Sequence, residues 1–189
     1  MEQENTESSG GYIPIPESFW SFETGRPFTQ CLVCAGDLSG DGTQYLVEKA
    51  FSHGEVVFEY ALCMDCRATL EGELSRQSLK LIGNYFDEHV DVIGRARRLL
   101  NDGNGDPKPW LSQCLVKGTP ITESTEYQIF GHCDGSDMLF SIFPYAISGE
   151  AIEDVVKLLS PQTKGFLDDF TGKYFGVPDG ANLPTILPL

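Results

Sequence analysis

Two neighbouring runs of apolar and β-branched residues stand out along the chain, YLVEKAFS at 45–52 and EVVFEYAL at 55–62. Only His53 and Gly54 separate them, and a two-residue connection ending in glycine is typical of a tight β-hairpin. The next segment, RATLEGEL at 67–74, repeats leucine at a spacing of four, as on the buried face of a helix. The pattern therefore predicts a hairpin followed by a helix.

Two serines mark the starts of later helices. Ser75 and Ser160 each precede an amphipathic run, and Pro161 follows the second serine at a position that favours proline. A further short helix is predicted at 91–100. The Gly-, Pro-, Asn- and Asp-rich stretch after it predicts a linker at 101–111.

Four cysteines form two C-x2-C pairs, Cys31 with Cys34 and Cys63 with Cys66, and 28 residues lie between the pairs. Four thiolates on two tight turns suit the tetrahedral coordination of zinc, and they leave no position open for a substrate. We therefore predict one structural zinc ion, with redox cysteines or iron as alternatives.

The order of knuckle, hairpin and helix resembles the treble-clef class of four-cysteine zinc fingers, with a zinc-ribbon-like ligand pattern, over about residues 29–75. The resemblance implies that Cys31 and Cys34 lie on the knuckle and that Cys63 and Cys66 lie on the first turn of the helix. It names no specific family. Treble clefs serve many unrelated functions, so the resemblance predicts a fold and not an activity.

An internal repeat is the next feature. TQCLVC at 29–34 matches SQCLVK at 112–117, and FEYALCMDC at 58–66 aligns with FPYAISGEA at 143–151. The apolar positions of the following helices continue to coincide. We therefore predict a second, degenerate copy of the same unit.

In the second copy the four ligand positions hold Cys114, Lys117, Ser148 and Ala151. A lysine cation and an alanine cannot bind zinc, and Ser148 suits the N-cap of a helix better than a metal. We expect a metal-free unit in which Lys117 points to solvent.

These patterns predict an α+β chain of two treble-clef-like units, each with a knuckle, a hairpin and two helices, packed on each other. The first unit would hold zinc and the second would not. Phe170 and Phe175 belong to an apolar set that suits either the core or the contact between the units. The predicted segments are an N-terminal extension at 1–28 with disorder at 1–12, the zinc unit at 29–100, the linker at 101–111, the degenerate unit at 112–178 and a tail at 179–189.

The charge of the chain narrows the choice of partners. Twenty-eight acidic residues against 13 lysines and arginines give a net charge of -15, which disfavours nucleic acid and anionic membranes and suits a basic protein partner. The N-terminal MEQENTESSGG lacks the features of a secretory signal, and no apolar run is long enough to span a membrane. We expect a cytoplasmic protein; the sequence does not indicate an oligomeric state.

Two rival functions start from other residues. Cys114, His132 and Cys133 could supply a nucleophile and its base, although buried unpaired cysteine is the ordinary interpretation. The cluster at 95–98 holds three arginines and could contact nucleic acid, as many zinc fingers do. The leading hypothesis remains a zinc-stabilised, non-catalytic binding protein.

Overall fold

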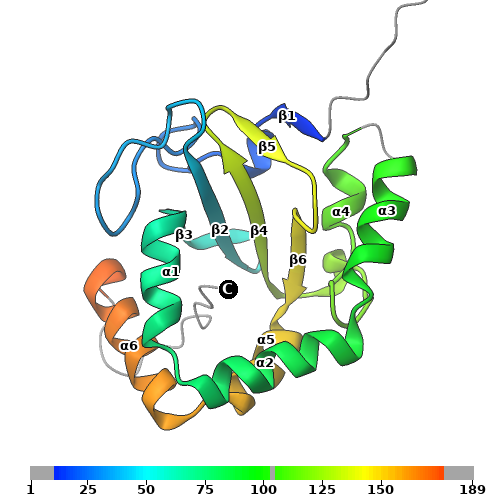
Figure 1. Ribbon diagram of the computed structural model, residues 1–189. Coiled ribbons are helices and arrows are strands. Elements are labelled where there is room, and N and C mark those ends of the chain that lie inside the picture. The colour runs from blue at the N-terminus through cyan, green and yellow to red at the C-terminus, as the bar shows by residue number, and fades with distance from the viewer. Residues whose placement is uncertain (1–10, 103–104, 177–189) are drawn as a thin grey trace, which may run out of the picture.

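The computed structural model describes residues 11–102 and 105–176, and within these residues the fold is α+β, with six α-helices and one six-stranded sheet (Figure 1). The strands are β1 (Tyr12–Pro14), β2 (Gln44–Ser52), β3 (Glu55–Cys63), β4 (Glu126–Asp134), β5 (Asp137–Leu139) and β6 (Tyr145–Ser148). The helices are α1 (Met64–Glu73), α2 (Arg76–His89), α3 (Val92–Asp102), α4 (Lys108–Leu111), α5 (Gly149–Leu158) and α6 (Pro161–Phe175).

The predicted hairpin is confirmed as β2 and β3. Its turn residues His53 and Gly54 have φ values of 53° and 84°, which is the left-handed geometry that a tight two-residue hairpin turn requires. The strands pair antiparallel, with one irregularity between Ala50 and Phe51. The connection therefore sets the register that carries Cys63 to the end of β3.

Strand β4 joins the two halves of the chain in one sheet. It pairs antiparallel with all nine residues of β2, so that the central residues Glu48 and Phe130 face each other. Its other edge pairs with β5 near Cys133 and with β6 from Tyr127 to Phe130. The predicted zinc unit and the predicted degenerate unit thus share a hydrogen-bonded sheet.

The helix starts follow the predicted caps. The hydroxyl oxygens of Ser75, Ser148 and Ser160 accept backbone N–H groups at the starts of α2, α5 and α6. Helices α1, α2 and α6 lie to one side of the sheet, whereas α3 and α4 lie beside β6 (Figure 1). Helix α4 falls inside the predicted linker.

The opposite face of the sheet is covered by the N-terminal part of the chain. Strand β1 pairs with β5, and the ring of Phe19 packs so closely on Gly131 that an added Cβ there would lie 2.7 Å from it. Lys49 donates to the carbonyl of Trp20. Of the predicted disordered stretch 1–12, residues 1–10 lie outside the described residues and Tyr12 begins β1; the predicted tail at 179–189 lies outside them as well.

Candidate metal centre

The four cysteines of the two C-x2-C pairs converge on one point. The sulfur atoms of Cys31, Cys34, Cys63 and Cys66 all lie within 4.8 Å of one another, and those of Cys34 and Cys63 are 3.9 Å apart. Four sulfurs bound tetrahedrally at about 2.3 Å from a zinc ion would lie about 3.8 Å apart. The cluster therefore fits a structural metal ion such as zinc.

Local backbone structure presents each sulfur. The backbone N–H of Cys31 donates to the carbonyl of Gly36 at 2.9 Å and closes the loop between them, in which Ala35 adopts a φ of 56°. Cys63 is the N-cap residue of α1, which places Cys66 in its first turn. Unpaired N–H groups and the positive end of the helix dipole favour thiolates there.

The thiols influence one another's protonation. Burial opposes ionisation of Cys31, but N–H groups of Cys34, Cys63 and Val33 outweigh it and lower its pKa to about 7. Burial raises the pKa of Cys63, and burial together with hydrogen bonds from neighbouring thiols raises the pKa of Cys66. A divalent cation would supply the charge needed to hold all four sulfurs as thiolates. Bound there, it would stabilise the fold, since no coordination position remains for a substrate.

The loop at Cys114 repeats the backbone hydrogen bonds of the loop at Cys31. The N–H of Cys114 donates to the carbonyl of Thr119 at 2.8 Å, the counterpart of the bond from Cys31 to Gly36. Leu115 donates to the carbonyl of Ala146 at 2.7 Å, just as Leu32 donates to Ala61 at 2.9 Å. The two loops therefore have the same local fold and dock on the same kind of strand.

Hydrogen bonds surround the sulfur of Cys114 in place of other sulfurs. It accepts three hydrogen bonds: from the hydroxyl of Ser148 at 3.2 Å, from the backbone N–H of Ser148 at 3.3 Å and from the backbone N–H of Lys117 at 3.4 Å. The side chain of Cys114 is buried. A thiol with these donors is a packed core group, as buried unpaired cysteines generally are.

Lys117 lies at the surface, but its side chain does not extend freely into solvent, because carboxylates pair with its ammonium. Its ammonium lies 2.6 Å from a carboxylate oxygen of Asp154 and 3.7 Å from Glu150, and its side chain is only 26% exposed. Asp154 also pairs with Lys157 at 3.0 Å. An ion-pair cluster therefore occupies the surface beside the second loop.

The residues of the enzyme hypothesis do not come together. Cys133 lies at one end of β4, where it pairs with Met138. Cys114 contacts Ser148, which pairs with Tyr127 near the other end of β4. Tyr127 and Cys133 are six residues apart, about 20 Å along the strand. His132 and Cys133 are adjacent in β4 and point to opposite faces. Burial raises the pKa of Cys133 to about 12, which makes that thiol unreactive.

The arginine cluster has a structural role. Arg95 donates to the carbonyls of Trp110 and Pro144 and lies 5.1 Å from the centre of the Trp110 ring. Its guanidinium thus fastens α3 to α4 and to the residue before β6. Arg97 and Arg98 are exposed on α3, and Arg98 lies 3.9 Å from a carboxylate oxygen of Asp91, which leaves little positive surface for a nucleic-acid contact.

Comparisons of the chain with protein-family models, with curated proteins and with solved structures find no match. Among the described residues, every helix is too short or too polar to cross a bilayer. Cysteine spacing, a local signal, points to the residues of the metal centre. The partners of Cys114 and Lys117 carry no such signal, because a serine and an aspartate are common everywhere.

Proposed function

We propose that this protein is a zinc-stabilised binding protein that performs no catalysis itself. The observation that carries the proposal is the closed cluster of four cysteine sulfurs within 4.8 Å of one another. A catalytic zinc site keeps a position open for water or substrate, and a site of four thiolates does not. The separation of Cys114, His132 and Cys133 removes the support for a thiol enzyme among the described residues.

The chain consists of two treble-clef-like units, of which the second has lost its metal. The matching hydrogen bonds at Cys31 and Cys114 support this proposal, and so does the pairing of β2 with β4. Equivalent strands that run antiparallel and meet at their centres are what an approximate two-fold axis produces. That axis would pass between Glu48 and Phe130.

A cluster of hydroxyl groups supports the same axis at a second point. The hydroxyl of Ser160 donates to that of Ser75 at 2.9 Å. The N–H of Ser75 donates to the hydroxyl of Thr163 at 3.0 Å, and the N–H of Ser160 donates to that of Ser78 at 2.9 Å. In the alignment of the two units Ser75 corresponds to Ser160 and Ser78 to Thr163. Each of the last two bonds therefore becomes the other when the units are exchanged, as a two-fold axis requires.

Substitution of the second loop tests the duplication. A Lys117→Cys, Ser148→Cys, Ala151→Cys variant supplies the three missing ligands beside Cys114, and elemental analysis should find two zinc ions per chain where the parent binds one. Adding Cys114→Ser should return the count to one. A count of one in the triple variant, with the first site intact, would argue against a shared ancestral geometry.

The partner is a basic protein, because the net charge of -15 attracts cations and repels nucleic-acid phosphates. On the described surface, negative charge gathers at a hollow of about 350 Å³ at the start of α5. Four glutamates line this hollow together with serine, threonine and glycine: Glu123, Glu126, Glu150 and Glu153.

Affinity capture on the immobilised zinc-loaded chain tests this partner. We expect basic proteins to be enriched and to be released as salt is raised. Neutralising the four hollow glutamates to glutamine should reduce capture. A control variant carries the same charge change at four exposed glutamates elsewhere, Glu17, Glu55, Glu73 and Glu88. Salt-sensitive retardation of a nucleic-acid probe by the parent chain would instead favour the nucleic-acid hypothesis.

A further inference from the structure

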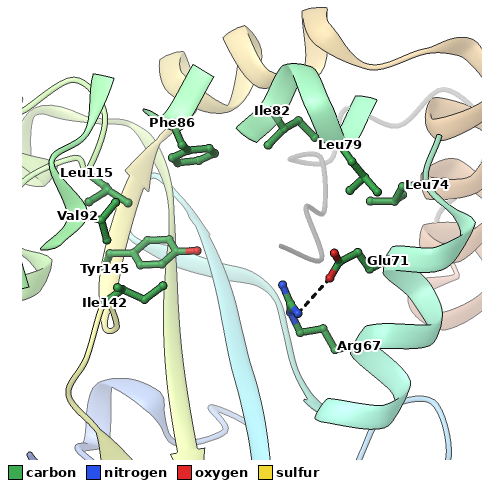
Figure 2. A pocket seen from close by; sticks show the side chains of 10 residues that line it. All are labelled: Arg67, Glu71, Leu74, Leu79, Ile82, Phe86, Val92, Leu115, Ile142 and Tyr145. Carbon is green, nitrogen blue, oxygen red and sulfur yellow. Dashed lines mark ion pairs between the residues drawn. The ribbon is translucent and has the colours of Figure 1, made fainter. Parts of the chain in front are cut away.

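A cavity of about 250 Å³ lies between the helices and the sheet. Figure 2 shows side chains of α2 above it, Arg67 and Glu71 of α1 at one end and Tyr145 of β6 at the opposite end. Its walls are mainly apolar and are formed by Leu74, Leu79, Ile82, Phe86, Val92, Leu115, Ile142 and Tyr145, with Arg67 and Glu71 as the charged members. Apolar cavities with a few placed polar groups are the usual form of small-molecule sites.

Hydrogen-bond donors gather at the end of the cavity nearest α1. Arg67 pairs through Nη1 with Glu71 at 3.1 Å, while its Nε–H is buried and has no hydrogen-bond partner among the described residues. The hydroxyl of Tyr145 points toward this end (Figure 2). Burial raises the pKa of Tyr145, so the hydroxyl stays protonated and can donate.

The corresponding tyrosine lies on the same face of the sheet, across β2 and β4, and is covered. Tyr60 lies on β3 as Tyr145 lies on β6, and its hydroxyl donates to Glu48. The rings of Phe170 and Phe175 pack over it, with centroids 6.2 and 5.9 Å away. Side chains thus fill the space beside Tyr60, while the space beside Tyr145 forms the cavity.

We propose that the cavity binds a small apolar molecule that ends in an uncharged carbonyl group, whose oxygen accepts the Nε–H of Arg67. The acceptor satisfies a buried donor that otherwise costs free energy. A carboxylate is disfavoured, because Glu71 already neutralises Arg67 and would repel a second anion beside it. This inference goes beyond the proposed function and does not depend on it.

The volume sets the size of the ligand. A dry apolar cavity of about 150 Å³ holds benzene, so about 250 Å³ holds a somewhat larger molecule, on the order of eight carbons. We therefore choose 2-octanone as the probe and octanoate as its charged counterpart.

Calorimetric titration of the zinc-loaded full chain with 2-octanone tests the proposal. We expect saturable one-to-one binding with a dissociation constant of about 1 mM or tighter, and binding of octanoate at least about tenfold weaker. No saturable binding of 2-octanone would overturn the proposal, and so would octanoate binding as tightly as the ketone.

Two variants and a control locate the ligand. Ile142→Trp should fill the mouth of the cavity and abolish binding; Ile142 is 40% exposed, so the fold tolerates the larger ring. Arg67→Met should remove the preference for the ketone over 1-octene, a probe of similar size without the carbonyl. Arg98→Met, at an exposed arginine outside the cavity lining, should bind as the parent does. A metal content equal to that of the parent verifies each variant, and unchanged ketone binding in both cavity variants would refute the site.

Discussion

The loops at Cys31 and Cys114 have the same backbone hydrogen bonds and different means of stabilisation. The first gathers four sulfurs, and the second surrounds one sulfur with a serine and places a lysine beside an aspartate. The comparison separates the loop fold, which short-range backbone bonds specify, from the element that holds it to the next helix. That element is a cluster of four sulfurs that fits a metal ion in one case, and neutral hydrogen bonds with a surface ion pair in the other.

The largest contrast is expected at the matched positions Cys63 and Ser148. Cys63→Ser removes one of the four sulfurs of the candidate metal centre. If zinc is bound as proposed, the variant should release it, with loss of a binding free energy of about 10 kcal/mol or more and unfolding of the first loop. Ser148→Ala removes a helix cap and a donor to Cys114, and should lower the free energy of unfolding by about 1 to 2 kcal/mol. Zinc analysis with chemical denaturation measures both; equal losses would contradict the assigned roles.

The hydroxyl cluster between the two helix starts should give intermediate effects. Ser78→Ala and Thr163→Val each leave a backbone N–H, of Ser160 or Ser75, without its acceptor in a buried place. We expect each to lower the free energy of unfolding by about 1 to 3 kcal/mol, by similar amounts if the two-fold relation holds. Urea denaturation measures the pair, and Ser39→Ala on the exposed surface serves as control. Strongly unequal losses would weaken the relation.

A pH dependence of stability is expected from His132 in β4. Burial lowers its pKa below the ordinary value of 6.5. Below pH 6.5 the unfolded chain therefore binds a proton that the folded chain does not. The free energy of unfolding decreases as the pH is lowered, by at most about 1.4 kcal/mol per pH unit, until the pH reaches the pKa of the folded state. The difference between the parent and His132→Asn, measured by denaturation from pH 7.5 to 5.5, isolates this proton. A pH-independent difference would exclude it.

The smallest effect is expected at the ion pair of the second loop. Hydrogen bonds from Lys117 and Lys157 lower the pKa of Asp154 to about 2, but this carboxylate is at the surface and salt screens it. Asp154→Asn should therefore destabilise the protein slightly at low salt and not at high salt. Denaturation at two ionic strengths measures this. A loss that persists in high salt would mean that the pair contributes through packing.

Local sequence signals predict much of the fold and of the metal centre. The His53-Gly54 turn, the capping serines and the two cysteine pairs each depend on residues a few positions apart, and the structure contains all three. The pairing of β2 with β4 joins residues about 80 positions apart, and no short pattern encodes it. The salt bridge of Lys117 escapes prediction for the same reason, since Asp154 lies 37 residues away.

The cavity too is formed by residues far apart in the sequence, so sequence patterns do not predict it. The sequence places Arg67 on a helix with a leucine stripe, while its neighbours Ile142 and Tyr145 belong to a distant segment. Only the sheet pairing brings α1 and β6 to the same space. Phe170 and Phe175, expected either in the core or between the units, pack on Tyr60 of β3.

Glu48 at the centre of β2 has a consequence for assembly. A fragment ending before 101–111 would expose the β2 edge that β4 covers, and exposed edges recruit strands from other copies. If the β2 strands of two copies paired antiparallel about the same central residue, the two Glu48 side chains would face each other at a buried position, where two carboxylates repel. Self-pairing of β4 would set Phe130 on Phe130, which is compatible with burial. One carboxylate thus discriminates against homotypic association of the first half and favours its union with the second.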